Sequence, residues 1–407
     1  MSFSAKARRR LGVCRTDARG HACRNVWLAA MLLALLYGAG CSKQWGKQSV
    51  RPRSLRDVPA ERLAYRFEAD TNGPPAVGPD PNDKLQSIEN DFDTRRKDDA
   101  LVRTVLSPDR QRVLALYETG DVQPGEFRID LYGADGNFLR NVTPPELSGA
   151  FAPTVSWSPD GNTIAFIGRK SVSPQPSPTP EDVPPQVEAS PPEPSATVAP
   201  LFAPIPVYAT EQIYVCNRDG YELKPLTSRE GLIYFYFVWA PDSHAVAALA
   251  CREDEWETRE AAHLLPAGRP RIVETSGQER LLDDALAECP PVWSPDSSKV
   301  ATAFETTIGI YDALTTTPTS ARIELREPLL AASRLYDEKK LGAKKKGENN
   351  ATPGMPVSFN PVVRLEWLLP ETLFIQTGFV RKYESETVTN FMRWHVLHLS
   401  PQAALLS

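Results

Sequence analysis

The chain has 407 residues, a length that fits one large domain or two of ordinary size. Hydrophobic residues make up 41% of it, which is enough for a sizeable core and excludes a wholly disordered chain. The chain has 46 basic and 51 acidic residues, of which seven basic residues and one acidic residue lie in residues 1–41. The rest of the chain therefore has 39 basic and 50 acidic residues, a net charge of −11. Phosphate binding depends on basic side chains, so we do not expect this acidic domain to bind nucleic acid.

Residues 1–40 have the organisation of an export signal. All seven basic residues lie between positions 6 and 24, and an apolar run over residues 26–40 follows them. The run is shorter than the roughly 20 residues that a transmembrane helix needs. It ends in Gly38-Ala39-Gly40-Cys41, which resembles the lipobox of bacterial lipoproteins. The resemblance implies that Cys41 is lipidated and becomes the new N-terminus. An ordinary signal peptide and an uncleaved short anchor are the alternatives.

The segment after the cysteine predicts where the chain is held. Residues 41–60 are polar without an apolar period, so we expect a flexible tether between the lipid and the folded domain. By analogy with bacterial lipoproteins, Ser42 in place of Asp implies sorting to the outer membrane, with the protein facing the periplasm. Retention in the inner membrane stays open.

A hairpin repeat runs through the rest of the chain. Each copy has a bulky anchor, a proline two positions later, an aspartate three positions later and a β-branched residue seven positions later. The anchors are Leu106, Trp157, Trp239 and Trp293, with a degenerate fifth copy at Trp367. We expect each anchor to end a strand and to pack between neighbouring sheets.

The repeated aspartates are predicted to be structural. Proline presets φ for a tight turn, and an aspartate side chain caps the backbone two residues further on. The predicted turn caps are Asp109, Asp160, Asp242 and Asp296. Their shared position in the repeat favours this role over a catalytic carboxylate set.

A second hairpin alternates with the first. Residues 129–143 and 213–227 share an apolar strand, an Asp-Gly pair and a second short strand, and residues 308–312 resemble a truncated third copy. Asp-Gly between two alternating runs is a strong signal for a two-residue hairpin turn. Two hairpins give four strands, which is one blade of a β-propeller. The sequence therefore predicts an all-β fold.

The combined pattern resembles a known family. Trp-Ser-Pro-Asp-Gly from Trp157, followed by Ile-Tyr-Val, Asp-Gly and Leu-Thr from Ile213, is similar to the WD-like repeat of the TolB propeller family. The resemblance covers roughly residues 100–400. It implies a β-propeller that docks a protein or peptide segment across the mouth of its central channel.

The spacing of the anchors predicts two insertions and the number of blades. Residues 171–206 contain 12 prolines and should be extended and disordered, and residues 325–356 are rich in lysine with a short helix over residues 328–341. We expect the propeller to occupy residues 61–407 with five or six blades. A sixth blade would combine residues 60–100 with the C-terminal strand over residues 391–399.

The cysteines leave the redox state open. The folded part contains Cys216, Cys251 and Cys289, and the chain has no Cys-x-x-Cys motif. One disulfide, such as Cys251–Cys289, and three buried reduced cysteines are both compatible with the sequence.

No catalytic or metal-binding motif is present in the sequence. It contains no Gly-x-Ser-x-Gly elbow, no phosphate-binding loop and no His-Glu-x-x-His. His395 and His398 are three residues apart on a predicted strand, so they should point to opposite faces and not share a metal ion. We expect no metal or other cofactor.

These observations predict a non-enzymatic binding module of the cell envelope, with a protein or peptide partner. Two alternatives remain open. One is an enzyme or sugar-binding propeller whose polar site lies at the channel mouth, with residues 253–256 as loop residues of that site. The other is a structural envelope component.

Overall fold

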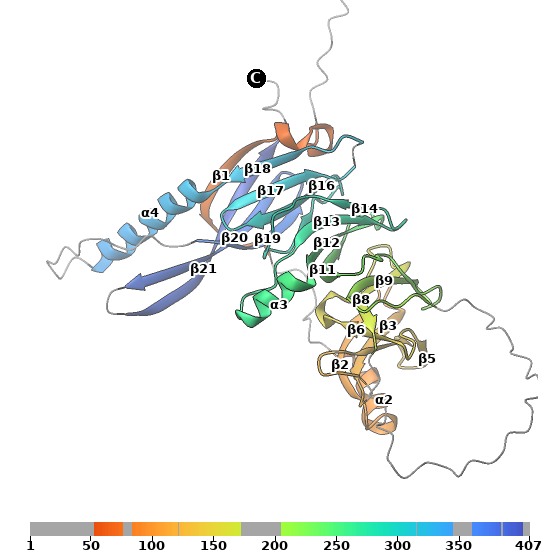
Figure 1. Cartoon of the computed structure of the whole chain (residues 1–407). Coiled ribbons are helices and arrows are strands. Elements are labelled where there is room, and N and C mark those ends of the chain that lie inside the picture. Colours follow the sequence, from red (N-terminus) through yellow and green to blue (C-terminus); the bar gives the residue numbers. More distant parts are fainter. Residues whose placement is uncertain are drawn as a thin grey trace, which may run out of the picture. The chain divides into compact units, whose positions relative to one another are not determined.

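The computed structural model describes residues 53–75, 84–120, 122–171, 205–314, 316–344, 360–383 and 386–401, except the side chains of residues 337–344 and 379–391. The predicted signal peptide, Cys41, most of the tether, residues 172–204 and residues 345–359 lie outside the described residues. The described residues form five antiparallel sheets, so the predicted all-β propeller fold is confirmed (Figure 1).

Three of the sheets are meanders whose strands follow one another in the chain. The first sheet contains β2 (Ala100–Leu106), β3 (Arg112–Glu118), β4 (Arg128–Gly133) and β5 (Phe138–Asn141). The third contains β11 (Leu232–Trp239), β12 (Ala245–Arg252), β13 (Arg269–Glu274) and β14 (Glu279–Leu281). The fourth contains β15 (Val292–Trp293), β16 (Lys299–Phe304), β17 (Thr307–Asp312) and β18 (Ser320–Glu324).

The second sheet follows the same plan with a divided first strand. Its order is β10-β9-β8-β6, and β7 also pairs with β8. The strands are β6 (Leu147–Ala150), β7 (Ser156–Trp157), β8 (Thr163–Lys170), β9 (Gln212–Asn217) and β10 (Lys224–Pro225). The 3₁₀ turn η3 (Ala152–Thr154) separates β6 from β7. The two pieces therefore occupy one strand position.

The fifth sheet joins strands from both ends of the described chain. Its order is β1-β21-β20-β19, with β1 (Ala64–Thr71), β19 (Val362–Leu369), β20 (Thr372–Tyr383) and β21 (Glu386–Ser400). β1 lies beside β21 in Figure 1. The two strands pair antiparallel, with Tyr65 opposite Leu399. The N-terminal and C-terminal strands thus pair as predicted, but they complete the fifth sheet. Because β2 belongs to the first sheet, the described residues form five sheets and no sixth.

Alternate residues of the central strands pack on opposite neighbours. In β8, Ile164 and Phe166 share a hydrophobic cluster with the first sheet, whereas Ala165 and Ile167 share one with the third sheet. The same alternation joins the third sheet to the fourth and the fourth sheet to the fifth. Side chains alternate across a strand, so a sheet with two apolar faces needs cover on both sides.

A helix covers the second face of the first sheet. Helix α2 (Gln86–Arg95) places Ile88 and Phe92, four residues apart, on one side. These two side chains pack against Val113 and Ala115 of β3, which face away from the second sheet. Figure 1 shows the helix beside the first sheet. The helix therefore takes the place that a preceding sheet has elsewhere.

The anchor of the first sheet is more exposed than the other anchors, because no sheet precedes the first sheet among the described residues. Four aromatic anchors are 5–7% exposed: Trp157, Trp239 and Trp293, which end their strands, and Trp367, which lies two residues before the end of β19. Leu106 was predicted to pack between sheets, but it is 43% exposed, so that prediction is wrong. Among the described residues, no hydrophobic cluster joins an earlier sheet to the first sheet. Helix α2 packs against residues of β3 on that face instead.

The repeated aspartates each accept the backbone N–H two residues further on. Asp296 also accepts hydrogen bonds from the Ser294 and Ser298 hydroxyls, at 2.7 Å each. The four backbone bonds come from Gln111 to Asp109, Asn162 to Asp160, His244 to Asp242 and Ser298 to Asp296, at 3.0–3.1 Å. These contacts are the turn-capping geometry that the repeat predicts.

Hydrogen bonds also link one turn to the next. The N–H of Asp160 donates to the Ser243 hydroxyl at 3.1 Å, and the N–H of Asp242 donates to the Ser297 hydroxyl at 3.0 Å. Gly161 stands at the corresponding position of the second sheet, with φ +71°, and has no hydroxyl to accept from Asp109. The first and second sheets therefore lack this particular link.

The anchor side chains form a second inter-sheet contact. The indole N–H of Trp157 donates to the Val105 carbonyl and that of Trp293 to the Val238 carbonyl, both at 3.1 Å. Each acceptor precedes the anchor of the previous sheet. The buried indole N–H of Trp239 has no hydrogen-bond acceptor among the described residues.

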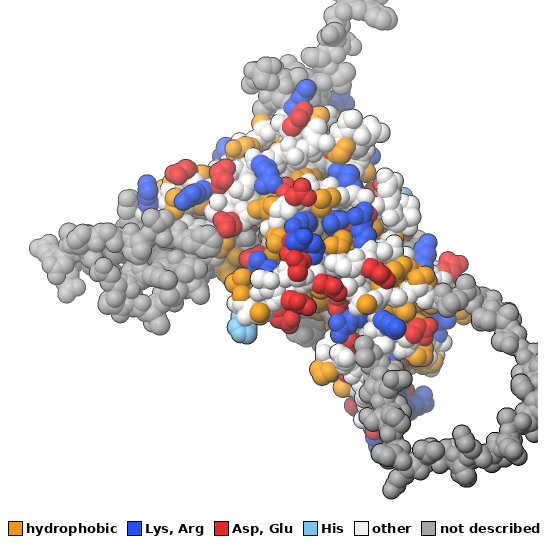
Figure 2. Space-filling model, in the orientation of Figure 1, with side chains coloured by type: hydrophobic (Ala, Val, Ile, Leu, Met, Phe, Trp, Pro, Cys, Tyr) orange, Lys and Arg blue, Asp and Glu red, His pale blue; other side chains and the backbone are white. Residues whose placement is uncertain are grey.

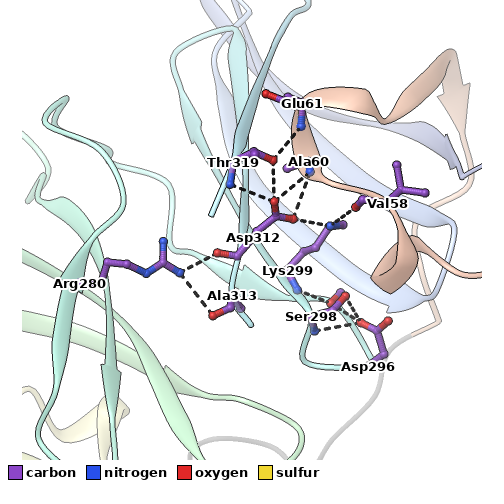
Figure 3. Close-up of polar contacts among 11 residues, drawn as sticks. Val58, Ala60, Glu61, Arg280, Asp296, Ser298, Lys299, Asp312, Ala313 and Thr319 are labelled. Atoms are coloured by element: carbon purple, nitrogen blue, oxygen red, sulfur yellow. Dashed lines mark hydrogen bonds and ion pairs between the residues drawn. The ribbon is translucent and has the colours of Figure 1, made fainter. Parts of the chain in front are cut away.

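A buried ion pair holds the N-terminal segment against the fourth sheet. The Lys299 ammonium lies 2.6 Å from Asp312 Oδ1, and both side chains are 2% exposed (Figure 3). Lys299 also donates to the Val58 carbonyl at 2.7 Å, and Asp312 accepts from the Ala60 N–H and the Thr319 hydroxyl. Burial opposes ionisation of Asp312, but the hydrogen bonds from Lys299, Thr319 and Ala60 outweigh it and lower its pKa.

The same network reaches the third sheet and moves the boundary of the tether. Arg280 of β14 donates to the Asp312 carbonyl at 2.6 Å (Figure 3). The two 3₁₀ turns η1 (Leu55–Asp57) and η2 (Ala60–Arg62) bury Leu55 and Ala60. The predicted tether over residues 41–60 is therefore too long, because residues 55–60 belong to the folded domain.

Two further helices lie in segments between strands. Helix α4 (Arg326–Lys344) contains the short helix predicted over residues 328–341 and extends beyond it at both ends. Helix α3 (Glu253–Ala261) follows β12 directly. Among the helices of the described segments, none combines the length and the apolar character needed to cross a membrane.

Substitution of Trp293 and of Trp239 by Phe should lower the stability of the fold by different amounts. We expect Trp293→Phe to lower the free energy of unfolding by about 1–2 kcal/mol more than Trp239→Phe. The first change removes the indole hydrogen bond to the Val238 carbonyl, whereas the second removes an N–H that has no acceptor among the described residues. Urea unfolding of both variants measures the difference. Equal losses would contradict the inter-sheet role of the indole bond.

The buried ion pair predicts a strong coupling between its partners. Asp312→Asn should cost about 3–5 kcal/mol because it leaves a buried ammonium without its carboxylate. The double variant with Lys299→Met should cost clearly less than the sum of the single variants. Because the pKa of Asp312 is lowered in the fold, its stabilisation is full above about pH 4 and disappears as the pH falls through the lowered value.

Urea unfolding between pH 2 and pH 7 checks both the coupling of Lys299 with Asp312 and the pH dependence of the stability. Glu61→Gln is the matched control, since the Arg62–Glu61 pair is more than half exposed and should contribute less than about 1 kcal/mol. An additive double variant, or an Asp312→Asn variant with the stability of Glu61→Gln, would contradict the account.

Candidate binding groove

A groove of about 800 Å³ lies between the outer strands of the first and second sheets. One wall comes from the first sheet and the following loop, and the other from the turn between β9 and β10. Its side chains include Tyr117, Arg128, Arg140, Pro145, Tyr221 and Leu223. An apolar pocket with a few convergent polar groups is the usual form of a ligand site.

Both walls end in strands that pair on one side. β5 is the last strand of the first sheet and pairs with β4, and β10 holds the same position in the second sheet. Phe138 and Leu139 of β5 are about half exposed. An edge strand with exposed apolar side chains offers backbone N–H and C=O groups to another strand.

Gly220 allows the two walls to approach one another. A Cβ atom at this position would lie 3.1 Å from Arg140 Cδ and 3.2 Å from Val142 Cγ2, and the residue has φ +72°. Both the close approach and the positive φ require glycine. The Asp-Gly pair recognised in the sequence as a hairpin turn thus also shapes the groove.

Arg140 is stacked on an exposed ring in the groove. Its guanidinium carbon lies 3.5 Å from the ring centroid of Tyr221, which is 59% exposed. Its Nε atom donates weakly to the Asn141 carbonyl at 3.4 Å. Its Nη1 atom is buried and has no hydrogen-bond acceptor among the described residues. An anionic group entering the groove would supply that acceptor.

Arg128 has a different task in the same groove. Its Nη1 atom donates to the Pro144 and Leu147 carbonyls at 2.8 Å, and its Nη2 atom donates to the Pro145 carbonyl at 3.1 Å. These bonds fix the loop after β5. Glu222 is the single carboxylate among the described lining residues, against two guanidinium groups. The groove therefore favours a negatively charged ligand.

The repeated aspartates and the aromatic anchors lie outside this groove. Asp109 accepts a hydrogen bond from Arg218 at 2.7 Å, and Arg112 pairs with Asp219, so two ion pairs connect the first sheet to the second. Acidic and basic side chains alternate over the face drawn in Figure 2, with hydrophobic side chains between them. That face presents no extended patch of one sign.

Residues 253–256 were expected in a loop at the channel mouth, but they begin helix α3. Glu255 forms two hydrogen bonds with Arg269 at 2.7 and 2.8 Å, which lower its pKa to about 2. Trp256 packs against Phe151 and Phe235, with ring centroids 5.7 and 5.5 Å away. These side chains support the fold around α3, and the loop placement was wrong.

The two histidines point in different directions and have separate partners. His395 is fully buried, lies 2.9 Å from the Thr377 hydroxyl and accepts a hydrogen bond from the Asp70 N–H. Burial, with the charge of Arg393, lowers its pKa to about 4. His398 lies 2.9 Å from Glu68. In the described part of the chain, no group of three or more His, Cys, Asp or Glu residues could hold a metal ion.

The three cysteines of the folded part are free and buried. Burial raises the pKa of Cys216 and Cys289 to about 12, and that of Cys251 to about 11. The thiol form is inert compared with the thiolate, so these side chains act as small core residues. The Cys251–Cys289 disulfide that the sequence left open is not formed.

Comparison with known proteins gives distant structural similarity and no sequence match. No protein-family model and no curated protein matches the sequence. Oligogalacturonate lyase from Vibrio parahaemolyticus aligns with 73% of this chain and 65% of its own, at 9% identity and a TM-score of 0.35. Prolyl oligopeptidase B from Galerina marginata aligns with 74% of this chain and 36% of its own, at 7% identity and a TM-score of 0.41.

A third similar structure is dipeptidyl peptidase 4 from Porphyromonas gingivalis. It aligns with 71% of this chain and 46% of its own, at 9% identity and a TM-score of 0.34. This chain spans less than two thirds of the length of each of the three proteins. The chain is a β-propeller by the order and packing of its own sheets, and the comparisons assign it neither a family nor an activity.

Proposed function

We propose that the protein is a non-enzymatic binding module of the bacterial cell envelope, and that its groove takes an extended segment of a protein or peptide. Lipid on Cys41 holds it at the outer membrane, facing the periplasm. The basic segment, the apolar run and the lipobox-like residues before Cys41 support the anchor. The WD-like repeat supports a TolB-like propeller, a family that docks peptide segments.

One observation carries the binding role. The groove lies between two edge strands and combines apolar walls with a buried guanidinium N–H that has no acceptor among the described residues. Adding a strand to an exposed sheet edge is a common way to bind an extended peptide. The sequence placed such docking at the channel mouth, whereas the groove lies at the outer strands of the first two sheets.

Photocrosslinking in the intact envelope tests the binding role. A photoreactive phenylalanine analogue at Tyr221 should crosslink to a protein, because this ring is exposed in the groove. The matched control is the same analogue at Tyr65 of the fifth sheet, which is half exposed. Mass spectrometry should find a protein adduct at position 221 and not at position 65. Lipid or polysaccharide adducts alone, or equal protein adducts at both positions, would count against the proposal.

The lipid anchor predicts a simple fractionation result. Cys41→Ser should release the protein from the membrane fraction while leaving its thermal unfolding unchanged, because Cys41 precedes the folded domain. Ser42→Ala is the control and should keep the protein in the membrane. A Cys41→Ser protein that stayed in the membrane at unchanged mass would identify the apolar run as an uncleaved anchor.

A further inference from the structure

We propose that the groove selects an acidic extended peptide, and that Arg140 recognises the carboxylate of that peptide. The inference rests on the proposed peptide-binding function and adds the chemistry of the ligand. It follows from the hydrogen bonds of the two arginines, from the stacking of Arg140 on Tyr221 and from the edge strand on which Arg140 lies.

The hydrogen bonds distinguish the two arginines. Arg128 is 6% exposed and donates to three backbone carbonyls in the loop after β5. Arg140 donates through Nε alone, over 3.4 Å, and its Nη1 has no acceptor in the described part of the chain. A buried donor without an acceptor is unfavourable, and a carboxylate is its strongest acceptor. Arg140 is therefore the group that gains most from an acidic ligand.

Stacking on Tyr221 prepares Arg140 for this role. The ring covers one face of the guanidinium at 3.5 Å and holds the plane of its N–H groups. A planar guanidinium with a fixed orientation can bind both oxygens of a carboxylate. Tyr221 is 59% exposed, so the ring of the stacked pair is open to solvent.

The backbone around Arg140 favours a peptide over other acidic polymers. Arg140 lies in β5, whose partner within the sheet is β4 alone among the described strands. A peptide paired with the free edge of β5 places every second side chain on the face that carries Arg140, which lies opposite Leu131. The bulge in the pairing of β4 with β5 puts Phe138 on the other face, opposite Tyr132. An acidic polysaccharide offers carboxylates but not the repeating N–H and C=O groups that an edge strand pairs with.

The test measures two labelled heptapeptides by fluorescence anisotropy against the full chain in detergent. One has the sequence Thr-Val-Glu-Val-Glu-Val-Thr, and the other has Gln in place of both Glu residues. The Glu peptide should bind about tenfold more tightly, as expected for one charge-assisted pair in a partly buried site. The preference should weaken as salt is raised.

Variants assign the preference to Arg140. Arg140→Gln should bind both peptides equally, and Arg140→Lys should keep part of the preference because it retains charge without the planar fork. Arg66→Gln, at an exposed arginine of the fifth sheet, should bind like the unchanged chain. Thermal unfolding of each variant checks the fold, and Arg140→Lys carries the test if Arg140→Gln is unstable.

The outcomes separate this inference from the proposed function. Equal binding of both peptides, lost when Tyr221 is replaced by Ala, would overturn the acidic selection and keep the peptide groove. Binding of neither peptide would overturn both the acidic selection and the peptide groove. Binding of the Glu peptide only after deletion of residues 172–204 would show that the chain's own acidic segment occupies the groove. That result would overturn the proposal that the groove binds a segment of another protein.

Discussion

The central strands of the first four sheets are apolar on both faces, so each of these sheets has to be covered on both sides. β8 meets this requirement by directing Ile164 and Phe166 to the first sheet and Ala165 and Ile167 to the third. The remaining sheets follow in chain order through their own clusters. The outermost face of the first sheet is covered by helix α2. The need to bury both faces of the first sheet thus accounts for the position of helix α2, which is not part of the hairpin repeat.

The contacts between sheets are not uniform, and the differences coincide with the groove. Turn-to-turn hydrogen bonds join the second sheet to the third and the third to the fourth, but Gly161 removes the bond between the first and second. Arg112 with Asp219 and Arg218 with Asp109 connect that pair of sheets instead. The groove opens at this junction. At the junction of the first and second sheets, two ion pairs replace the turn-to-turn hydrogen bond that the later sheets share. The hairpin repeat is therefore irregular at this junction.

The sequence predicts those features that depend on local spacing. The Pro-Asp turns and the strand period follow from short-range patterns, and the five sheets confirm the fold class. Pairing of the N-terminal and C-terminal strands was expected in a sixth blade and occurs in the fifth sheet. Leu106 was misplaced because its burial depends on whether a sheet precedes it. The start of the domain was misplaced because Val58 and Ala60 are held by Lys299 and Asp312, which are 241 and 252 residues away in the chain.

The groove lay beyond sequence reasoning for the same reason. Arg140 and Tyr221 come from different sheets and are separated by the proline-rich insertion, so neither spacing nor periodicity brings them together. The available signal was Asp219-Gly220, which predicted a turn but not what the turn approaches. Contact between two hairpins of neighbouring sheets is a tertiary property, and only the packing of the sheets reveals it.

Hydrogen exchange with and without the acidic heptapeptide tests the central claim most directly, because it reports which backbone amides the ligand covers. The account predicts that added protection falls on residues 138–145 and 220–225, with the central strands β3, β8, β12 and β16 already slow in the free protein. Protection gained around helix α3 or on the fifth sheet, with residues 138–145 unchanged, would contradict it.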